Sequence, residues 1–504
     1  MDKNFYITTP IYYPSAKPHM GHAYSSIVAD FFARFKRIQG YNVFFLTGTD
    51  EHGQKVEIAA KNKKINPLEF VNQVSKNFEK LSNLLNLSNN DFIRTTENRH
   101  KASCQKLWSD LEKSGNIYLD KYSGWYSVRD EAFFSENELL NGKAPTGADV
   151  EWVEEPSYFF RLSNWQDELL NFYEENKDFI LPITRKNEVV SFVKSGLKDL
   201  SISRTSFNWG VPVPNNEKHI MYVWLDALTN YITASGYSSD ANKFETFWPA
   251  DLHVVGKDIL RFHAVYWPAF LMAAKLPLPK RVFAHGWWTN EGEKISKSIG
   301  NVIDPVKLIE DFGLDQVRYF LIREVPFGND GDFSKKNLIQ RINSDLANSL
   351  GNLFQRVISF SVKNCDEKVP NHENKFTPKD QDLIDSINLE LNQIKKLIEI
   401  QKLDDCLKVI WTKISNSNKY IDEQAPWNLK TTDQKRMNVI LYCLIESIRQ
   451  IGILLQPFVP DTASKILDSL SVDNKERSFA SLKDKIKTGV FLKKPNQLFP
   501  RINE

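Results

Sequence analysis

The chain has 504 residues, enough for about three domains at roughly 150 residues each, which excludes a small scaffold stapled by disulfides. Its 65 Lys and Arg nearly balance its 63 Asp and Glu, and the net charge of +2 excludes a global field that would draw the chain onto nucleic acid or membrane. A nucleic-acid partner would therefore have to be bound through local patches.

The four cysteines are widely separated, at positions 104, 365, 406 and 443. Without a CxxC pair they favour neither a disulfide framework nor a thiolate zinc site, and reduced buried thiols are typical of a cytoplasmic protein. The longest apolar run, residues 264–274, contains a proline and is shorter than the roughly 20 residues that span a bilayer. The N-terminus shows no signal-peptide pattern. We expect a cytoplasmic protein without a membrane partner.

The first predicted elements in the chain form a βαβ crossover. Residues 5–9 predict a strand, residues 21–38 a helix and residues 43–47 a second apolar strand. The helix is predicted from an apolar face and from Gly40 just beyond its end. That face consists of Tyr24, Ile27, Val28, Phe31, Phe32 and Phe35. We expect the helix N-terminus at the carboxyl edge of a parallel sheet, where open α/β folds bind ligands.

Further strands of that sheet are predicted far along the chain, at residues 252–255 and 282–285, with a helix over residues 258–274 between them. Residues 116–214 are rich in Trp, Tyr, Glu and turn residues, lack the βαβ rhythm and predict a mixed domain inserted into the sheet. After residue 341, apolar residues recur at helical spacing and predict a bundle of helices. The recurring positions are Leu383, Ile387, Leu391, Ile394 and Ile398, and then Ile440, Leu444, Ile448, Ile451 and Leu455.

The first motif that carries chemistry is Pro18-His19-Met20-Gly21-His22, between the first strand and the helix. His19 and His22 share a face of the first helical turn, where backbone N–H groups and the helix dipole favour an anion. Gly21 leaves room for a nucleotide to approach the backbone. Two imidazoles aimed at phosphates could stabilise the charge that develops during transfer at an α-phosphorus, but the same string also fits a pair of capping histidines.

The second motif is Lys294-Ile295-Ser296-Lys297-Ser298, and turn residues on both sides of it predict a mobile loop after a hairpin. Movable lysine charges suit a pyrophosphate leaving group, because they can close on a triphosphate as its charge builds. By itself the string is typical of a solvated basic loop. Its occurrence together with the histidine motif far upstream favours the chemical interpretation.

The two motifs together resemble the signatures of the class I aminoacyl-tRNA synthetases, and finer strings are similar to those of the methionyl-tRNA synthetases. These strings extend over nearly the whole chain and are highly specific in combination. They are residues 8–14 (TTPIYYP), 47–53 (TGTDEHG), 222–227 (YVWLDA) and 255–259 (VGKDI), then Asn348, Asn352 and Arg356, and finally Ala425-Pro426-Trp427.

The resemblance implies an α/β fold, in which a Rossmann-type parallel-sheet catalytic domain is split by a connective insertion and followed by an α-helical anticodon-binding bundle. The two halves of the catalytic domain would be residues 1–115 and 220–286, with the insertion at 116–219. A stem-contact segment carrying the lysine loop would cover residues 287–340, and the anticodon-binding domain residues 341–504.

The reaction implied by the resemblance begins with attack by the methionine carboxylate on the α-phosphate of ATP, which releases pyrophosphate, and ends with transfer of the methionyl group to the terminal adenosine of tRNA. The catalytic residues would be His19, His22, Lys294 and Lys297. The ATP site would consist of His19, His22, Gly256, Asp258, His285 and Lys297, with Arg204 restraining the lysine loop. We expect Mg²⁺ with the ATP, without a protein carboxylate dedicated to it.

The methionine pocket implied by the resemblance has Asp50 for the ammonium group. Its wall would consist of Ile11, Tyr13, Trp224, Ala227, Leu228, Tyr231, Ile259 and His263. A thioether has no charge and little hydrogen-bonding ability, so shape and soft contact with aromatic rings must recognise it. Without the resemblance, Trp224 in its strand-like run and His263 would fit core positions, and Asp50 beside Glu51 and His52 would fit a helix cap or a metal cluster.

The resemblance also implies an anticodon site in the helical bundle. Asn348, Asn352 and Arg356 stand at i, i+4, i+8 spacing on one helix face, and their amide and guanidinium groups can read base edges. Trp427 offers a flat surface on which an unstacked base could stack, worth about 1–3 kcal/mol. The expected partners are methionine, ATP and both initiator and elongator tRNA(Met).

One string departs from many relatives, which carry cysteine-ligated zinc in the insertion. The corresponding residues 124–130 (GWYSVRD) contain no cysteine, so the chain resembles the zinc-free form of the family and we expect no metal. We also expect a monomer, because no appended dimerisation module is visible.

Two rival hypotheses remain on the sequence alone. A nucleotidylyltransferase could use the same histidine motif, although it would not need the helices that carry Asn348, Asn352, Arg356 and Trp427. The second hypothesis is a degenerate synthetase retained as an RNA-binding or scaffold protein. The intact histidines and lysines of the two motifs argue against it.

Overall fold

The computed structural model describes residues 3–14, 17–130, 132–134, 136–294 and 302–503. The chain forms two compact units. Unit 1 comprises Met1–Ala29 and Val43–His285, and unit 2 comprises Asp30–Asn42 and Gly286–Glu504. Helix α1 (Met20–Ile38) therefore gives its first half to unit 1 and its second half to unit 2.

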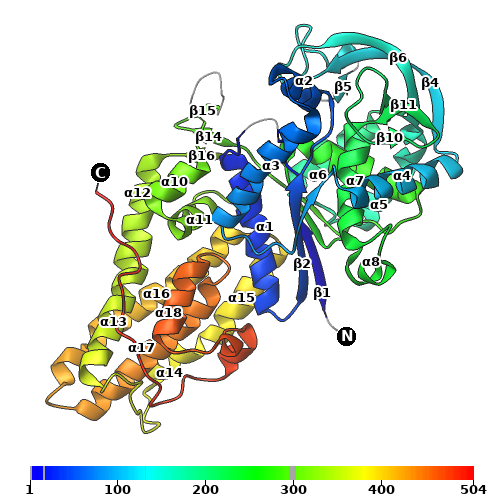
Figure 1. The fold of residues 1–504 in the computed structure, drawn as a ribbon. Helices are drawn as coiled ribbons and strands as arrows, with labels where there is room; N and C mark the ends of the chain where they lie inside the picture. Colours follow the sequence, from blue (N-terminus) through cyan, green and yellow to red (C-terminus); the bar gives the residue numbers. More distant parts are fainter. Residues whose placement is uncertain (1–2, 15–16, 131, 135, 295–301, 504) are drawn as a thin grey trace. The chain divides into compact units, whose positions relative to one another are not determined.

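Unit 1 is built on a six-stranded sheet in the order β3-β2-β1-β12-β13-β7, and Figure 1 shows β1 beside β2. The strands are β1 (Asn4–Thr8), β2 (Asn42–Thr49), β3 (Asp91–Arg94), β7 (Ile180–Leu181), β12 (Leu252–Gly256) and β13 (Val282–His285). The pairs β3/β2, β1/β12, β12/β13 and β13/β7 are parallel. The strand order reverses next to β1, and open α/β sheets bind ligands at such a switch point.

The predicted crossover of strand, helix and strand is confirmed by β1, α1 and β2, and the two later strands by β12 and β13. The residues of β12 and β13 are all buried, as expected for parallel strands covered on both faces. The short strands β3 and β7 escape prediction, because so few residues hold no recognisable period. β7 comes from within the predicted insertion and forms one edge of the catalytic sheet.

The helices of unit 1 differ in two places from the prediction. Helix α7 (Val223–Ser235) includes Trp224, so the strand-like interpretation of that apolar run is wrong: the run is buried almost all round and has no period that separates helix from strand. The helix expected over 258–274 is divided into a 3₁₀ turn (Lys257–Ile259), a π-helical segment (Phe262–Tyr266) and α9 (Trp267–Ala273). The remaining helices are α2 (Gln54–Asn62), α3 (Pro67–Leu84), α4 (Asn98–Lys113) and α8 (Ala241–Phe247).

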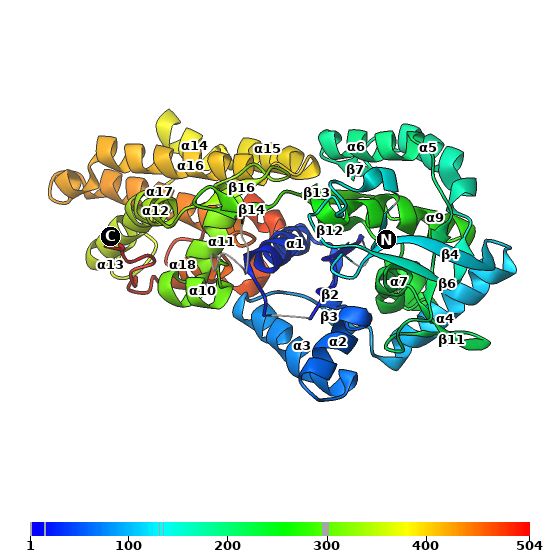
Figure 2. The ribbon, with the colours of Figure 1, turned by 90° about the horizontal axis from the view of Figure 1, so that it is seen from above.

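The inserted region contains a four-stranded sheet in the order β5-β4-β6-β8, and the long β4 and β6 run together in Figure 2. These strands are β4 (Ile117–Ser127), β5 (Ala132–Phe134), β6 (Glu151–Phe160) and β8 (Leu200–Ser201). A smaller antiparallel sheet consists of β9 (Ser203–Arg204), β10 (Pro212–Val213) and β11 (Asn216–Met221). Helices α5 (Gln166–Glu175) and α6 (Ile183–Lys194) complete the region, which matches the predicted mixed composition.

The long segment of unit 2, Gly286–Glu504, begins with a small sheet and continues as the predicted helical bundle, drawn from green to red in Figure 1. The sheet consists of β14 (Trp288–Asn290), β15 (Glu293–Lys294) and β16 (Gly331–Phe333). The helices that follow are α10 (Pro305–Phe312), α11 (Leu314–Arg323), α12 (Lys335–Arg341), a π-helical segment (Ile342–Gly351), α13 (Asn352–Asn364), α14 (Pro378–Asp385), α15 (Ile387–Glu399), α16 (Leu403–Gln424), α17 (Gln434–Leu455) and α18 (Pro460–Ser469).

The second predicted apolar rhythm lies on the central helix of the bundle. Helix α17 is long and apolar enough to cross a membrane, but it is almost wholly buried among its neighbours, as a core helix is. Three of its polar side chains pair inside the bundle: Arg449 Nη2 lies 2.7 Å from Glu446 Oε1, and Gln450 Nε2 donates to the same oxygen at 2.9 Å. The first rhythm, from Leu383 to Ile398, is interrupted at Ser386 between α14 and α15, although its apolar residues are all buried.

A buried ion pair fixes the second half of α1 in unit 2. Arg318 Nη2 lies 2.7 Å from Asp30 Oδ2, and neither side chain is exposed (0% for both). The same guanidinium donates to the backbone carbonyls of Pro457 at 3.1 Å and Phe458 at 3.2 Å. Since a buried charge needs a partner, Asp30 and Arg318 depend on each other.

Candidate active site

The carboxyl ends of four parallel strands lead into the predicted site. Ile11 and Tyr13 follow β1, Asp50 follows β2, Asp258 follows β12, and His285 is the last residue of β13. Parallel strands present these ends at one edge of a sheet. The fold thus brings together residues that are far apart in the sequence and that the motifs singled out.

The histidine motif opens α1, as predicted. The backbone N–H of Gly21 donates to His19 Nδ1 at 3.1 Å, and the backbone N–H of His19 donates to His22 Nδ1 at 3.1 Å. Because each Nδ1 accepts a hydrogen bond, the proton of each neutral ring is on Nε2. The rings stack with centroids 3.8 Å apart, so the two Nε2 donors form one local group suited to phosphate oxygens.

Glycine at position 21 leaves room for the ring of His19. A Cβ at this position would lie 3.0 Å from His19 Cε1, so any larger residue would push the imidazole away. A similar close approach occurs at Gly256, where a Cβ would lie 2.5 Å from Asp258 Oδ1. The two glycines therefore leave room for the side chains of His19 and Asp258 to lie close to the backbone at positions 21 and 256.

His285 is buried and packs against α1. Its Nε2 lies 2.6 Å from Ser25 Oγ, and the edge of the Tyr24 ring faces it at a centroid distance of 5.1 Å. The side chain therefore braces the first turns of the helix that carries His22. A direct contact between His285 and ATP stays a prediction.

The predicted methionine-pocket residues of α7 meet those of the segment after β12. Trp224 stacks on Phe262 with ring centroids 3.7 Å apart and an interplanar angle of 8°. The Trp224 and His263 rings meet edge to face, with centroids 6.2 Å apart. Ile11, Ile259 and Trp224 are partly buried beside Leu228 and Tyr231 in one apolar cluster. The fold therefore brings these five predicted residues together, whereas Tyr13 packs against a separate cluster formed by α2 and α3. Their role as a methionine pocket stays a prediction.

The protonation of His263 is set by its surroundings. Its Nδ1 lies 2.9 Å from the carbonyl oxygen of Ile259, which can only accept, so Nδ1 carries the proton. Burial lowers the pKa of His263 to about 4, and the ring is neutral at physiological pH. Its Nε2 is then an acceptor for the Tyr231 hydroxyl at 2.7 Å. The pair presents a neutral polar surface within the predicted pocket, as an uncharged thioether requires.

The loop that carries Asp50 is held by its neighbour Glu51. The Glu51 carboxylate accepts from Arg94 Nε at 2.6 Å, from Ser75 Oγ at 2.5 Å and from Thr49 Oγ1 at 2.8 Å. Burial alone would raise the pKa of Glu51, but these hydrogen bonds outweigh it and lower that pKa. Asp50 itself does not begin a helix, because α2 starts behind Gly53. The helix-cap interpretation of Asp50 is therefore wrong.

Arg204 lies inside the inserted region rather than at the edge of the catalytic sheet. It is 2% exposed, donates to Ser201 Oγ at 2.8 Å and lies 3.6 Å from Glu155 Oε1. The rings of Tyr122, Tyr126 and Tyr222 surround its guanidinium at 5.9, 5.4 and 5.3 Å. These aromatic rings hold the charge by cation–π attraction. A contact of Arg204 with ATP or with the lysine loop stays a prediction.

The hairpin predicted before the lysine loop is present. β14 and β15 pair antiparallel, with Thr289 opposite Lys294, and the turn residues Glu291 and Gly292 both have positive φ, 50° and 81°. Lys294 ends β15, whereas Lys297 lies outside the described residues. The catalytic role of both lysines stays a prediction.

The predicted anticodon residues lie in unit 2, but their helix is not regular. Asn348 belongs to the π-helical segment, whereas Asn352 and Arg356 belong to α13, so the simple i, i+4 spacing does not apply along the whole stretch. The Arg356 guanidinium lies 5.6 Å from the centre of the Trp427 ring, and its Nη2 lies 2.6 Å from Asp422 Oδ1. Trp427 is 43% exposed, which leaves its ring accessible to a base.

Two functional candidates lie outside the motifs. Phe262 covers one face of Trp224, and Arg501 Nε donates to Asn348 Oδ1 at 2.9 Å. Phe262 stands three residues after Ile259 and could have been found from that spacing. Arg501 lies far along the chain from Asn348, and no local signal connects the two.

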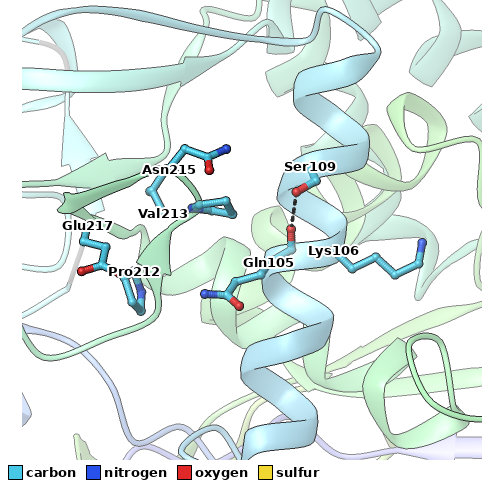
Figure 3. A pocket seen from close by; sticks show the side chains of 8 residues that line it. Gln105, Lys106, Ser109, Pro212, Val213, Asn215 and Glu217 are labelled. Atoms are coloured by element: carbon cyan, nitrogen blue, oxygen red, sulfur yellow. Dashed lines mark hydrogen bonds between the residues drawn. The ribbon is translucent and has the colours of Figure 1, made fainter.

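A surface cleft of about 420 Å³ is lined by a different set of residues (Figure 3). It opens between α4 and the turn that joins β10 to β11. Gln105, Lys106 and Ser109 line one side, and Asn215 and Glu217 line the other. None of the residues singled out by the motifs lies in it, so this cleft is not the predicted active site.

Known proteins resemble the chain over its full length. A family model described as "tRNA synthetases class I (M)" matches residues 5–149 and 135–358, and one described as "Anticodon binding domain of methionyl tRNA ligase" matches residues 369–504. The methionine–tRNA ligase of Rickettsia felis is 58% identical, with 99% of each chain covered. That of Rhizobium meliloti is 53% identical, with 99% of this chain and 98% of the relative covered.

Solved structures agree with these relatives. A Mycobacterium tuberculosis methionyl-tRNA synthetase in complex with methionyl-adenylate has a TM-score of 0.96 at 50% identity, covering 99% of this chain and 100% of that one. The apo form of the enzyme from the same organism has a TM-score of 0.90 at 46% identity, covering 100% and 99%. The fold and the two motifs are thus those of a class I tRNA synthetase. Within that class, the chain belongs to the methionyl-tRNA synthetase family.

Proposed function

We propose roles for individual residues in the reaction that this chain catalyses as a methionine–tRNA ligase. It activates methionine with ATP to methionyl-adenylate and pyrophosphate, and then transfers the methionyl group to the 3′ end of tRNA(Met). The observation that carries this function is similarity over the full length, which includes both the catalytic and the anticodon-binding family models.

The direct test is ATP–pyrophosphate exchange with each standard amino acid in turn, followed by charging of tRNA that bears a CAU anticodon. Methionine should stimulate exchange most strongly, and the tRNA should be charged. Stronger stimulation by another amino acid would contradict the assignment. Exchange without charging would favour the nucleotidylyltransferase alternative.

At the ATP end, His19 and His22 bind the phosphates through their Nε2–H groups. This role is supported by the backbone hydrogen bonds that fix both Nδ1 atoms as acceptors. Gly256 and Asp258 follow β12 at the same sheet edge and contribute to the nucleotide site. Mg²⁺ accompanies the ATP and is held mainly by phosphate oxygens, as is usual for this ion.

Lys294 and Lys297 neutralise the leaving pyrophosphate. Lys297→Ala is expected to slow adenylate formation by about 2–4 kcal/mol of transition-state stabilisation, because a mobile positive charge would be lost where negative charge builds. Methionine binding should be nearly unchanged. Single-turnover adenylation measures the rate, and an unchanged rate in Lys297→Ala would remove this residue from the mechanism.

At the methionine end, Asp50 pairs with the ammonium group and the aromatic wall holds the thioether. This division is supported by the buried Asp50 at the end of β2 and by the stacked rings of Trp224 and Phe262. The neutral Tyr231–His263 pair closes the polar side of the pocket. An apolar pocket discriminates by only about 1–3 kcal/mol per methylene, so close methionine analogues should also be activated.

In unit 2, Trp427, Arg356, Asn352 and Asn348 read the anticodon. Trp427→Ala is expected to raise the KM for tRNA by about 5- to 150-fold, the equivalent of the roughly 1–3 kcal/mol that base stacking supplies. Pyrophosphate exchange should be unaffected, since it does not require tRNA. Aminoacylation kinetics and exchange, measured on the same preparation, provide the two readouts.

A matched control for this variant is Phe491→Ala, which truncates another exposed aromatic side chain of unit 2 (51% exposed). It should leave the KM for tRNA unchanged. Equal damage to exchange and to aminoacylation in Trp427→Ala would mean that this residue supports the fold rather than the anticodon.

The fold of the insertion is held together without zinc. The protein is a cytoplasmic monomer, and it charges both initiator and elongator tRNA(Met). Side-chain packing supports the first point: Trp125 meets Trp152 across β4 and β6 with centroids 5.3 Å apart, and the tyrosines around Arg204 add to it. Metal analysis of the purified, active protein tests for zinc, and its sedimentation tests for a monomer. Stoichiometric zinc or a stable dimer would overturn the respective point.

A further inference from the structure

The carboxylate of Asp226 joins two buried histidines that come from different elements. Asp226 lies in the first turn of α7, His52 lies in the loop after β2, and His100 lies in the first turn of α4. His52 Nδ1 is 2.6 Å from Asp226 Oδ2, and His100 Nε2 is 2.7 Å from Asp226 Oδ1. All three side chains are at most 2% exposed. The motifs assign no role to Asp226 or His100.

A metal ion does not explain this cluster. His100 Nε2, Cys104 Sγ and Asp226 do offer donor atoms close to one another. Two nitrogen or oxygen ligands of one tetrahedral zinc lie about 3.3 Å apart, given zinc–ligand distances of about 2.0–2.1 Å. The 2.7 Å between His100 Nε2 and Asp226 Oδ1 is instead the distance of a hydrogen bond. The carboxylate therefore accepts a hydrogen bond from each ring.

These hydrogen bonds are charge-assisted and lie in a dry environment. Burial alone would raise the pKa of Asp226, but the charges and hydrogen bonds of His52 and His100 outweigh it and hold the pKa well below its usual value. Asp226 is therefore ionised, and hydrogen bonds to a buried carboxylate are stronger than those between neutral groups. The cluster is a rigid link between the β2 loop and α7.

Both ends of the link lie beside predicted methionine-binding residues. His52 follows Asp50 by two residues, and Asp226 stands between Trp224 and Ala227. The hydroxyl of Tyr13, another predicted pocket residue, donates to the backbone carbonyl of His52 at 3.0 Å. The link therefore sets the position of the ammonium-binding loop relative to the aromatic wall.

We propose that Asp226 is a positioning residue for methionine recognition: by holding His52, it places Asp50 at the correct distance from the pocket wall on α7. This proposal rests on the role proposed above for Asp50. Asp226 acts through His52 and the loop backbone, without touching the substrate.

The test is Asp226→Asn, which keeps the size of the side chain. The amide nitrogen of the new side chain is a hydrogen-bond donor, and it would face the N–H donor of one histidine ring. One of the two histidines must therefore lose its hydrogen-bond partner or change tautomer. We expect the KM for methionine in pyrophosphate exchange to rise roughly 10- to 100-fold, the loss of a hydrogen bond to a charged group. The KM for ATP should change less than about twofold.

Asp380→Asn is the matched control. Asp380 is equally buried and is bound by Tyr420 Oη at 2.6 Å and by Arg436, but it lies on α14 in unit 2. It should lower the melting temperature as Asp226→Asn does, without a change in the KM for methionine. An unchanged methionine KM in Asp226→Asn, or equal increases in the methionine and ATP KM values, would overturn the proposal.

Asp50→Asn distinguishes this proposal from the function on which it rests. If Asp226 acts through Asp50, the effect of Asp226→Asn on the methionine KM should shrink when Asp50→Asn is already present. Fully additive effects would overturn the proposal. If Asp50→Asn alone leaves the methionine KM unchanged, the proposed ammonium role of Asp50 is wrong. If Asp50→Asn raises the methionine KM and Asp226→Asn does not, only the positioning role of Asp226 is wrong.

Discussion

Replacing Asp30 with alanine is expected to lower the free energy of unfolding of unit 2 by about 3–5 kcal/mol. The reason is that the fully buried Arg318 would lose the carboxylate that lies 2.7 Å from its Nη2. The carbonyls of Pro457 and Phe458 would still accept from the guanidinium, but they cannot neutralise it. Thermal and denaturant unfolding, followed by the helical signal, measures the loss.

The double variant Asp30→Ala with Arg318→Met provides the control for this prediction. It removes both charges and replaces the guanidinium with an apolar side chain, so it should be more stable than Asp30→Ala alone. If Asp30→Ala costs no more than a surface substitution, within about 0.5 kcal/mol, the pair does not stabilise unit 2 and the prediction is wrong.

Replacing His22 with alanine is expected to slow adenylate formation roughly 10²- to 10³-fold, the effect of losing one preorganised donor at a developing charge. The structure supplies the reason: the backbone N–H of His19 occupies His22 Nδ1, so the donor of the neutral ring is Nε2. Methionine binding should change little. Single-turnover formation of methionyl-adenylate at saturating ATP measures the rate.

Two further substitutions at this position separate the ring's two nitrogens. The Asn side chain reaches only to the position of Nδ1, so His22→Asn keeps an acceptor for the His19 N–H and lacks the distal donor. His22→Gln places an amide N–H near the position of Nε2. We expect His22→Asn to be as slow as His22→Ala and His22→Gln to recover part of the rate. A normal rate in His22→Asn would show that this histidine only caps the helix.

The catalytic fold was predictable where a local period or a string of motif residues exists. The crossover from β1 through α1 to β2 follows from one apolar helix face between two apolar runs. The run that contains Trp224 was misassigned, because α7 is buried on nearly every side and shows no polar face. The edge strand β7 is too short to give a pattern and is defined only by its partner β13.

The residues of the candidate site were likewise predictable only where they stand in a local string of motif residues. His19, His22 and Asp50 stand in recognisable strings beside strand ends, and the sheet brings those ends together. The partners of Arg204 could not be predicted, because they are tyrosines from β4 and from the residue before α7, which only tertiary structure brings to it. The link from Asp226 to His52 and His100 spans 174 and 126 residues, and no local pattern reports contacts of that range.

The continuity of α1 limits how the enzyme can be divided. Phe31 packs on Phe458 with ring centroids 4.6 Å apart, and Phe35 packs on Phe479 at 5.0 Å. A shortened chain that ended at His285 would retain the whole helix but lose both of these partners. The bare phenylalanines would form an exposed apolar patch, and such patches promote aggregation. An isolated activating half of this protein would therefore need polar residues at these positions before it could be expressed as a well-behaved fragment.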